Sequence, residues 1–185
     1  MKRIGLVLCV FLLAGCSWKE KELDRAMELR TRLLNASDCS FRAEITADYG
    51  DKVHSFTMDN LSGGDGNVRF EVVKPDSIAG ITGSVGESGG ELTFDDTALA
   101  FPLLANGLLA PVSAPWLLMK TLRSGYLTSA GMEGEYLRLT IDDRYEEDAL
   151  TVDVWVNDEN CPVRAEFSWQ GKSILTILVE DFRIG

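Results

Sequence analysis

The sequence predicts an α+β fold that is mostly antiparallel β, with one strongly curved sheet (an incomplete barrel) and helices in or over its concave face. Beyond about residue 38, most of the chain alternates apolar and polar residues with a period of two, in runs separated by turn residues. One helical pattern precedes these runs, and one uncharged, proline-broken segment interrupts them. About ten short strands and two helices fit this order when a single sheet curves around the helices.

The N-terminal stretch has the layout of a secretory signal. Lys2 and Arg3 give a positive start, an apolar run covers Ile4 to Leu13, and small residues precede Cys16. The run is about half of the roughly 20 residues that span a bilayer, which argues against a permanent transmembrane helix. An ordinary cleaved signal with a chance cysteine is the alternative interpretation.

Leu13-Ala14-Gly15-Cys16 resembles the lipobox of bacterial lipoproteins. The resemblance implies cleavage before Cys16, which then carries lipid such as palmitate, and at least two acyl chains, which hold a protein stably on a membrane. We therefore expect a signal peptide over residues 1–15, a tether over 16–22 and a single domain over 23–185. The protein would be lipid-anchored to the cell membrane or the outer membrane and face the extracytoplasmic side.

Composition fits one globular domain. Hydrophobic residues make up 45% of the chain and charged residues 25%, unlike a disordered chain. The net charge of −11 falls to about −13 once Lys2 and Arg3 leave with the signal, and such a body repels nucleic acid and anionic headgroups. We expect no nucleic-acid partner, and membrane contact through the N-terminal lipid.

Two cysteines remain for the domain, because Cys9 leaves with the signal and Cys16 takes lipid. Cys39 and Cys161 share the parity of the inward residues of their strands, and exported chains meet no thiol-reducing pool. A disulfide and two separately buried thiols both stay open, since a bridge needs α-carbons about 4.4–6.8 Å apart.

A helical pattern covers Lys19 to about Asn35. Its apolar residues fall within one arc that Arg30 interrupts, and charged residues occupy the opposite face. The apolar residues are Leu23, Ala26, Met27, Leu29, Leu33 and Leu34. Because the stripe lacks the aromatic and basic bias of membrane-surface helices, we expect this helix to pack against the domain rather than lie on the bilayer.

Residues 40–59 predict a β-hairpin closed by Gly50-Asp51. Apolar and polar residues alternate on both sides of this two-residue turn, and the turn sets the register. The expected pairs are Ile45 with Phe56, Ala43 with Met58, Ala47 with His54, and Arg42 with Asp59. The chain's single histidine would then lie among apolar partners, which favours a structural role over metal binding or catalysis.

Further alternation predicts strands on both sides of the mid-chain segment. Gln170-Gly171 closes a final hairpin that sets Phe167 opposite Ile174. Residues 174–179 are apolar on both faces, which predicts that this strand is covered on both sides. The other expected strands lie near 68–72, 77–86, 92–94, 99–101, 137–141, 150–156 and 163–167.

The segment 98–118 is almost uncharged and broken by prolines. Ser113 and Pro115 predict the start of a helix that runs to about Arg123 and is stopped by Gly125. So much apolar surface either plugs the curved sheet or forms the mouth of an apolar cavity. In the second case, the residues that we expect to face a ligand are Phe101, Leu104, Leu108, Trp116 and Leu117.

This order of elements, with its apolar mid-chain insertion, resembles the lipoprotein-localisation (LolA/LolB-like) fold over most of residues 19–185. The resemblance implies an incomplete barrel whose apolar concave face, covered by helices, holds acyl chains. The expected anchor is closer to the anchored acceptor of that family than to its unanchored carrier. The chain also resembles lipid-anchored relatives in spore-forming bacteria, some of which bind a cell-wall amidase, and this likeness implies a protein-binding scaffold without lipid cargo.

The sequence carries no catalytic signature: it lacks a nucleophile with a credible histidine base, a phosphate loop and a metal-ligand cluster. The acidic run 142–148 lacks the glycine and spaced oxygens of a calcium loop, so we expect a solvated loop. We expect no enzyme, no cofactor and no metal. Two functions remain open: binding a hydrophobic (acyl-chain or lipoprotein) ligand in the hollow, or recruiting or activating another envelope protein, such as a cell-wall enzyme, through an apolar patch or free strand edge.

Overall fold

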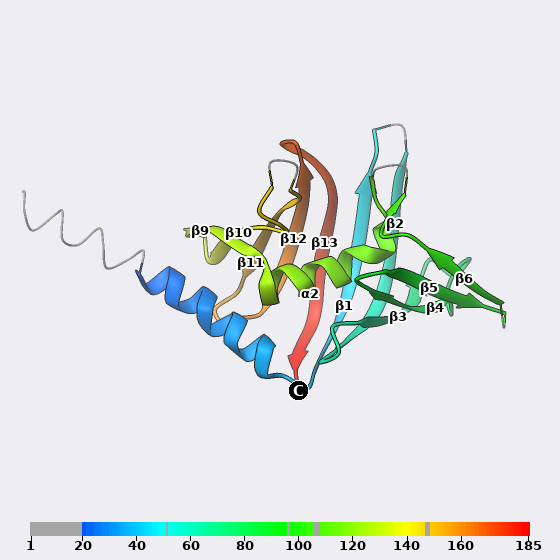
Figure 1. The fold of residues 1–185 in the computed structure, drawn as a ribbon, viewed down its shortest axis with the longest axis horizontal. Helices are drawn as coiled ribbons and strands as arrows, with labels where there is room; N and C mark the ends of the chain where they lie inside the picture. The colour runs from blue at the N-terminus through cyan, green and yellow to red at the C-terminus, as the bar shows by residue number, and fades with distance from the viewer. Residues whose placement is uncertain (1–19, 51, 96, 106–107, 147–148) are drawn as a thin grey trace, which may run out of the picture.

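The computed structural model describes residues 20–185 except 51, 96, 106–107 and 147–148, and shows one curved sheet with helices packed against it (Figure 1). The signal, its cleavage site and Cys16 lie outside the described residues. The first helix covers residues 20–35, close to the range predicted for it. A 3-10 turn (Pro111–Ser113) leads into α2 (Ala114–Ser124), which crosses the hollow of the sheet.

Eleven antiparallel strands form the sheet in the order β6-β5-β4-β3-β2-β1-β13-β12-β11-β10-β9, and β7 with β8 form a separate two-stranded ribbon. Within the described residues, β6 and β9 each have one neighbour, so the sheet is open, as predicted. The strands are β1 (Asp38–Asp48), β2 (Val53–Gly63), β3 (Val68–Lys74), β4 (Thr82–Gly86), β5 (Gly89–Phe94), β6 (Thr97–Phe101), β7 (Leu104–Ala105), β8 (Leu108–Leu109), β9 (Tyr126–Glu133), β10 (Tyr136–Asp142), β11 (Thr151–Val156), β12 (Pro162–Trp169) and β13 (Lys172–Ile184).

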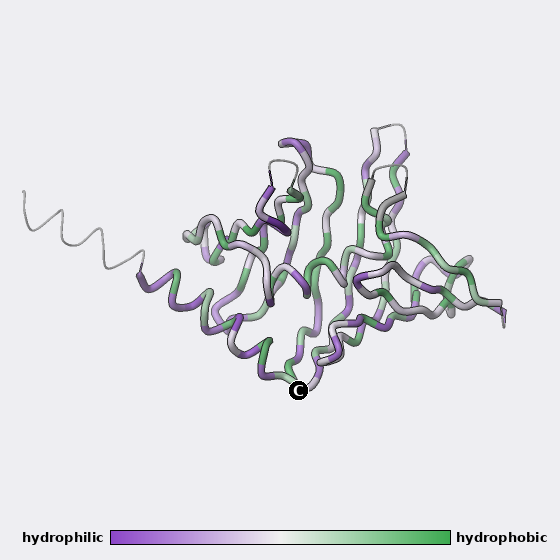
Figure 2. Tube along the Cα trace, viewed as in Figure 1, coloured by the Kyte–Doolittle hydropathy of each residue, from purple (hydrophilic) through white to green (hydrophobic). Residues whose placement is uncertain are grey.

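The hydrophobic core lies between the sheet and the helices. Apolar residues recur along the strands, as the green segments of Figure 2 show. Alternate residues of a strand face the same side, so these residues can gather on the face that the helices cover. Ile45 and Val154 are fully buried, and Leu139 is 2% exposed. α2 is buried on nearly all sides, which is typical of a helix that fills a core.

The first hairpin is confirmed in its register. Ile45 pairs with Phe56 and Arg42 with Asp59, and the guanidinium donates two hydrogen bonds to the carboxylate at 2.7 and 2.8 Å. His54 pairs with Ala47 as expected, but its side chain is exposed, so its predicted apolar environment is wrong. Ala47 itself is fully buried, whereas residues 53–55 of β2 are all exposed, so the cover at this end of the hairpin lies over β1 and does not reach His54.

The last hairpin differs from the prediction by one residue. Phe167 pairs with Leu175 rather than Ile174, because a β-bulge between Phe167 and Ser168 shifts the register. The predicted cover on both faces of β13 is also wrong: Leu178, on the outer face, is 46% exposed.

The first helix packs on the domain, as predicted, through part of its apolar arc. Ala26, Leu29 and Leu33 are buried, whereas Leu23 and Met27 stay about half exposed. Leu34 is exposed as well. The buried residues follow the spacing of three and four that places side chains on one helix face.

Arg30, which interrupts the apolar arc, binds the C-terminal end of α2. Its guanidinium donates to the carbonyl oxygens of Leu122 at 3.0 Å and Gly125 at 2.8 Å. In return, Arg123 of α2 donates to the carbonyl oxygen of Leu33, near the end of the first helix, at 3.2 Å. Each helix thus supplies a positive charge to the partly negative end of the other, which holds the two together.

Candidate functional site

Two of the predicted ligand-facing residues, Trp116 and Leu117, lie in the core. Their exposed fractions are 5% and 3%, and the indole nitrogen of Trp116 donates to the carbonyl oxygen of Gly66 at 3.0 Å. The ammonium group of Lys120 lies 5.2 Å from the indole ring, which favours a cation–π contact. The second half of the mid-chain segment, which forms the start of α2, therefore fills the hollow of the sheet as part of the core.

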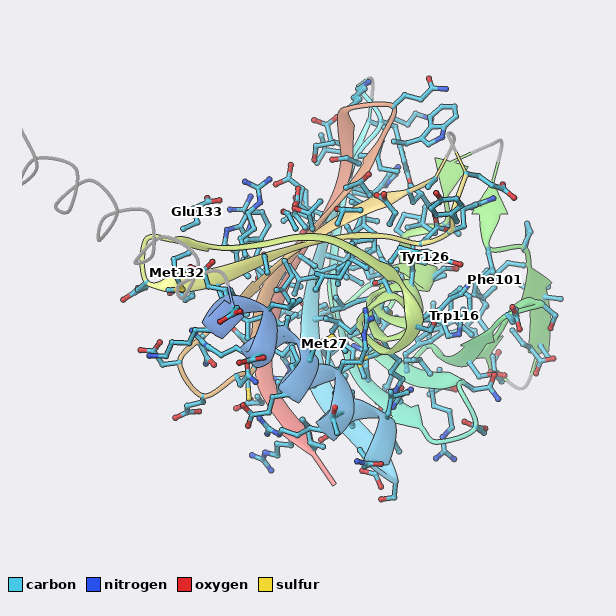
Figure 3. All side chains as sticks on the ribbon, turned by 60° about the vertical axis from the view of Figure 1, so that its left-hand side comes forward. Met27, Phe101, Trp116, Tyr126, Met132 and Glu133 are labelled. Atoms are coloured by element: carbon cyan, nitrogen blue, oxygen red, sulfur yellow. The ribbon has the colours of Figure 1, made fainter. Side chains whose placement is uncertain are left out.

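Phe101 lies farther out, on the other side of α2 from the first helix (Figure 3). Its ring covers Gly90 of the neighbouring strand so closely that a Cβ there would clash with the ring. Phe101 is partly buried against the core. The backbones of Leu104 and Leu108 belong to β7 and β8, and their side chains lie outside the described part of the structure.

A small enclosed cavity remains between the first helix, α2 and strands β9 and β10. Its volume of about 10 Å³ is room for about one water molecule, whereas pockets for small ligands measure about 300–1,000 Å³. The lining residues are Ala26, Met27, Leu29, Arg30, Leu122, Leu127, Leu139 and Ile141. The helices therefore leave no room for an acyl chain at this place.

The first part of the mid-chain segment forms an exposed apolar edge. Leu99 on β6 is 57% exposed and Phe94 on β5 is 53% exposed. Leu99 pairs with Leu92, so the three side chains share one face of the arm that β4, β5 and β6 extend away from the core (Figure 1). We call Leu92, Phe94 and Leu99 with the backbone of β6 the β6 edge.

The backbone of the β6 edge has free hydrogen-bonding groups. Phe94 pairs with Thr97, the last pair before the chain turns, and Leu92 pairs with Leu99 two positions on. In a tight antiparallel hairpin these are the pairs that exchange hydrogen bonds, and the pairs between them do not. Ala98 and Ala100 therefore turn their N–H and C=O groups away from β5, where no strand pairs with them among the described residues. Such a row of groups is a template for an added strand.

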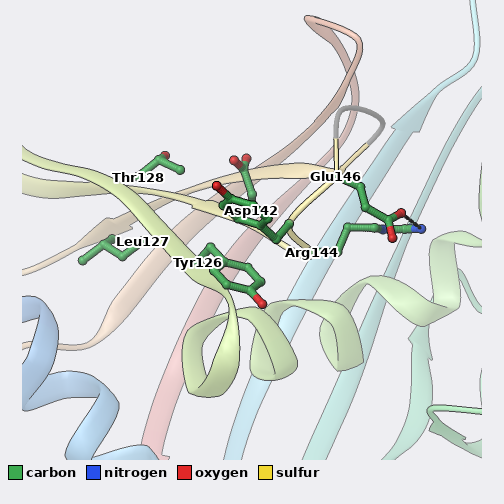
Figure 4. A pocket seen from close by; sticks show the side chains of 7 residues that line it. Tyr126, Leu127, Thr128, Asp142, Arg144 and Glu146 are labelled. Atoms are coloured by element: carbon green, nitrogen blue, oxygen red, sulfur yellow. Dashed lines mark ion pairs between the residues drawn. The ribbon is translucent and has the colours of Figure 1, made fainter.

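An open groove of about 560 Å³ lies at the opposite edge of the sheet, beside the start of β9 (Figure 4). Tyr126 and Tyr145 form one wall, with ring centroids 5.6 Å apart. The other lining residues are Leu127, Thr128, Asp142, Arg144 and Glu146. This groove was not predicted, because the sequence does not state which strand ends the sheet.

The acidic run that starts at Asp142 was expected to be solvated, but its second residue, Asp143, is held against the protein. The Asp143 carboxylate is 7% exposed and accepts the backbone N–H of Leu150 at 2.7 Å. Among the residues that the structure describes, no three potential metal ligands come together. Neither described helix has the length and apolar character of a membrane span.

Cys39 and Cys161 are both free thiols. Cys39 is buried beside Arg123, whose guanidinium lies 4.0 Å from the sulfur, and burial raises the pKa of this thiol above its ordinary value. The Cys161 thiol, by contrast, donates to the carbonyl oxygen of Glu159 at 3.8 Å.

A charged cluster surrounds Trp155 and was not predicted from the sequence. Arg138 and Arg164, its neighbours on the adjacent strands, cover the ring at 5.2 and 4.5 Å. Arg138 also binds Asp153 and Glu133, each at 2.9 Å. The alternation of the three strands, once aligned, would have placed these side chains together.

No protein-family model matches this chain, and the search of curated proteins found no match. Solved structures are similar to it. A LolA superfamily protein from Nitrosomonas europaea is 14% identical, with a TM-score of 0.44, over 90% of this chain and 93% of that chain. The lipoprotein LppX from Mycobacterium tuberculosis is 11% identical, with a TM-score of 0.41, over 88% and 93% of the two chains.

A further similarity is to a chain in the complex of the CwlD amidase with the GerS lipoprotein from Clostridioides difficile. The identity is 14% and the TM-score 0.43, over 86% of this chain and 93% of that chain.

Proposed function

We propose that this protein is a lipid-anchored, non-catalytic binding protein of the cell envelope. Lipid on Cys16 tethers the domain to the extracytoplasmic side of the cell membrane or outer membrane, and the β6 edge binds an extended, apolar segment of another envelope protein. Attachment through lipid suits an acidic chain with a net charge of −11, because its charge does not favour anionic headgroups.

The exposed apolar β6 edge is the observation that carries this proposal. Leu99 and Phe94 are more than half exposed, beside backbone groups that pair with no further strand in the part of the chain that the structure describes. A partner strand would gain hydrogen bonds from the backbone of Ala98 and Ala100 and apolar contacts from the side chains. Soluble domains usually protect such an edge with charge, proline or a covering element.

We favour a protein partner over an acyl ligand in the hollow. Trp116 and Leu117 fill the place where we expected a ligand, and the enclosed cavity nearby holds about 10 Å³. An acyl chain there would have to displace core side chains, each of which is worth about 2–5 kcal/mol when buried.

The test is affinity purification of the full-length protein from the membranes of its own host. We expect a stoichiometric protein partner with the wild type and its loss with Leu99→Lys, which places a charge in the apolar contact. Ala100→Pro should have the same effect, because proline removes an edge donor without removing a bond to β5. Val53→Lys is the control, since Val53 is 63% exposed on a different hairpin.

Native mass spectrometry of the same preparations separates the two functions. A partner that is lost with both β6 variants and kept with Val53→Lys supports the proposal. A bound lipid in place of a protein, or a partner that both β6 variants retain, would reject it.

A further inference from the structure

We propose that the groove beside β9 binds an extended, positively charged peptide segment of a partner protein, which adds as a strand to the β9 edge. This second surface lies at the opposite end of the sheet from the β6 edge and goes beyond the function proposed above.

The backbone of β9 provides the first part of this surface. Glu133 and Tyr136 pair next to the turn between β9 and β10. Because the pair that closes a tight hairpin is a hydrogen-bonded one, the alternation turns the N–H and C=O groups of Ala130 and Met132 outward. Within the described residues, no other strand pairs with β9 on that side. An added strand would satisfy these groups.

Tyrosine rings provide the second part. Tyr145 is 86% exposed and Tyr126 is 52% exposed, and together they wall a groove of about 560 Å³. A volume of this size accommodates several side chains of a bound segment. Tyrosine is enriched at protein interfaces because its ring offers apolar area and its hydroxyl a hydrogen bond.

The negative charge around the groove favours a positively charged segment as its ligand. The groove is lined by the carboxylates of Asp142 and Glu146 and by the guanidinium of Arg144. Arg144 is already paired, with Asp143 at 3.3 Å and with Glu146 at 4.0 Å. Figure 4 shows the second of these ion pairs, and the two pairs leave the described part of this loop with surplus negative charge. The whole chain is also acidic, with a net charge of −11, which steers basic segments toward it.

Fluorescence anisotropy with a defined probe tests this inference. The probe is a labelled ten-residue peptide of alternating Val and Thr that carries three Lys, compared with the same peptide carrying Glu, and the protein is the full chain with Cys16→Ser. We expect the Lys peptide to bind at low salt, to weaken as salt rises, and to bind at least about tenfold more tightly than the Glu peptide.

Three variants locate the site. Tyr145→Ala and Ala130→Pro should each weaken binding about tenfold, because one removes a wall and the other an edge donor. Glu146→Gln should weaken it about threefold, whereas Glu44→Gln, an exposed acid on β1, should leave it unchanged. The Tyr145 side chain is so exposed that Tyr145→Ala should not unfold the domain. This variant therefore still tests the site if Ala130→Pro proves unstable.

Equal binding of the Lys and Glu peptides, or full affinity in Tyr145→Ala, would overturn the inference. Leu99→Lys should leave the affinity for the Lys peptide unchanged, because Leu99 lies on β6, at the opposite edge of the sheet from β9. The failure of this site and the failure of the β6 edge are therefore separate results.

Discussion

Arg30 illustrates how a residue that breaks a sequence pattern can hold the fold together. It stands within an apolar arc, and burial lowers the pKa of its guanidinium, yet that group caps the carbonyl end of α2. A positive charge there satisfies acceptors that a helix end leaves free. Together with Arg123, it fixes the two helices in the hollow.

We predict that Arg30→Gln lowers the free energy of unfolding by about 1.5–3 kcal/mol, because carbonyl groups lose charged donors. Arg32→Gln is the control: Arg32 is partly exposed and donates a single long bond of 3.4 Å to the carbonyl oxygen of Glu159. Its effect should stay within about 0.5 kcal/mol. Urea denaturation of the Cys16→Ser protein measures both values. Equal losses in the two variants would contradict the capping role.

The ion pair on the first hairpin gives a prediction on pH. Hydrogen bonds from Arg42 lower the pKa of the Asp59 carboxyl below its ordinary value. A lowered folded-state pKa contributes stability above the unfolded pKa, and this contribution is lost as the pH falls through the folded pKa. NMR titration should show the pKa of Asp59 rising in Arg42→Gln. The pKa of Asp65, which Asn67 lowers, should not change.

At the scale of elements, the mid-chain segment divides into a buried helix and an exposed strand. Leu118 on α2 is fully buried, whereas Leu99 on β6 is 57% exposed. Composition alone could not separate these parts, because a core and a binding edge both need apolar side chains.

The same substitution should therefore have different effects in the two parts. Leu118→Ala should cost about 3 kcal/mol of stability through the cavity it leaves, and Leu99→Ala less than about 1 kcal/mol. Thermal and urea unfolding of the two variants provide the comparison. A large loss with Leu99→Ala would mean that β6 serves the core rather than a partner.

Hairpins explain what the sequence could predict and what it could not. The position of Gly50-Asp51 in the sequence predicted the register of β1 and β2, because the two strands pair along their whole length without a register shift. The bulge at Phe167 moved the last hairpin by one residue, and nothing in the local alternation marks it. The contacts of Arg30 and Arg123 join residues about 90 positions apart in the chain, so local patterns did not reveal them. The groove beside β9 depends on which strand ends the sheet, which local patterns do not show either.

For the whole molecule, an open sheet with a filled hollow places the candidate binding surfaces at its two edges. The sequence predicted the curved sheet and the helices over it, and the structure confirms both.

The lipid anchor on Cys16 stays a prediction. Cys16→Ser should move the protein from the membrane fraction to the supernatant after export, and an unchanged distribution would contradict a lipid tether.

Site-specific photo-crosslinking tests the central claim most directly. A photoreactive residue replaces Leu99, or Val53 as the control, in the membrane-anchored protein of its own host. We predict a covalent adduct with one protein from position 99 alone, and its loss when Ala98→Pro and Ala100→Pro are added. Adducts with phospholipid at position 99, or the same protein captured equally from position 53, would contradict a partner bound at the β6 edge.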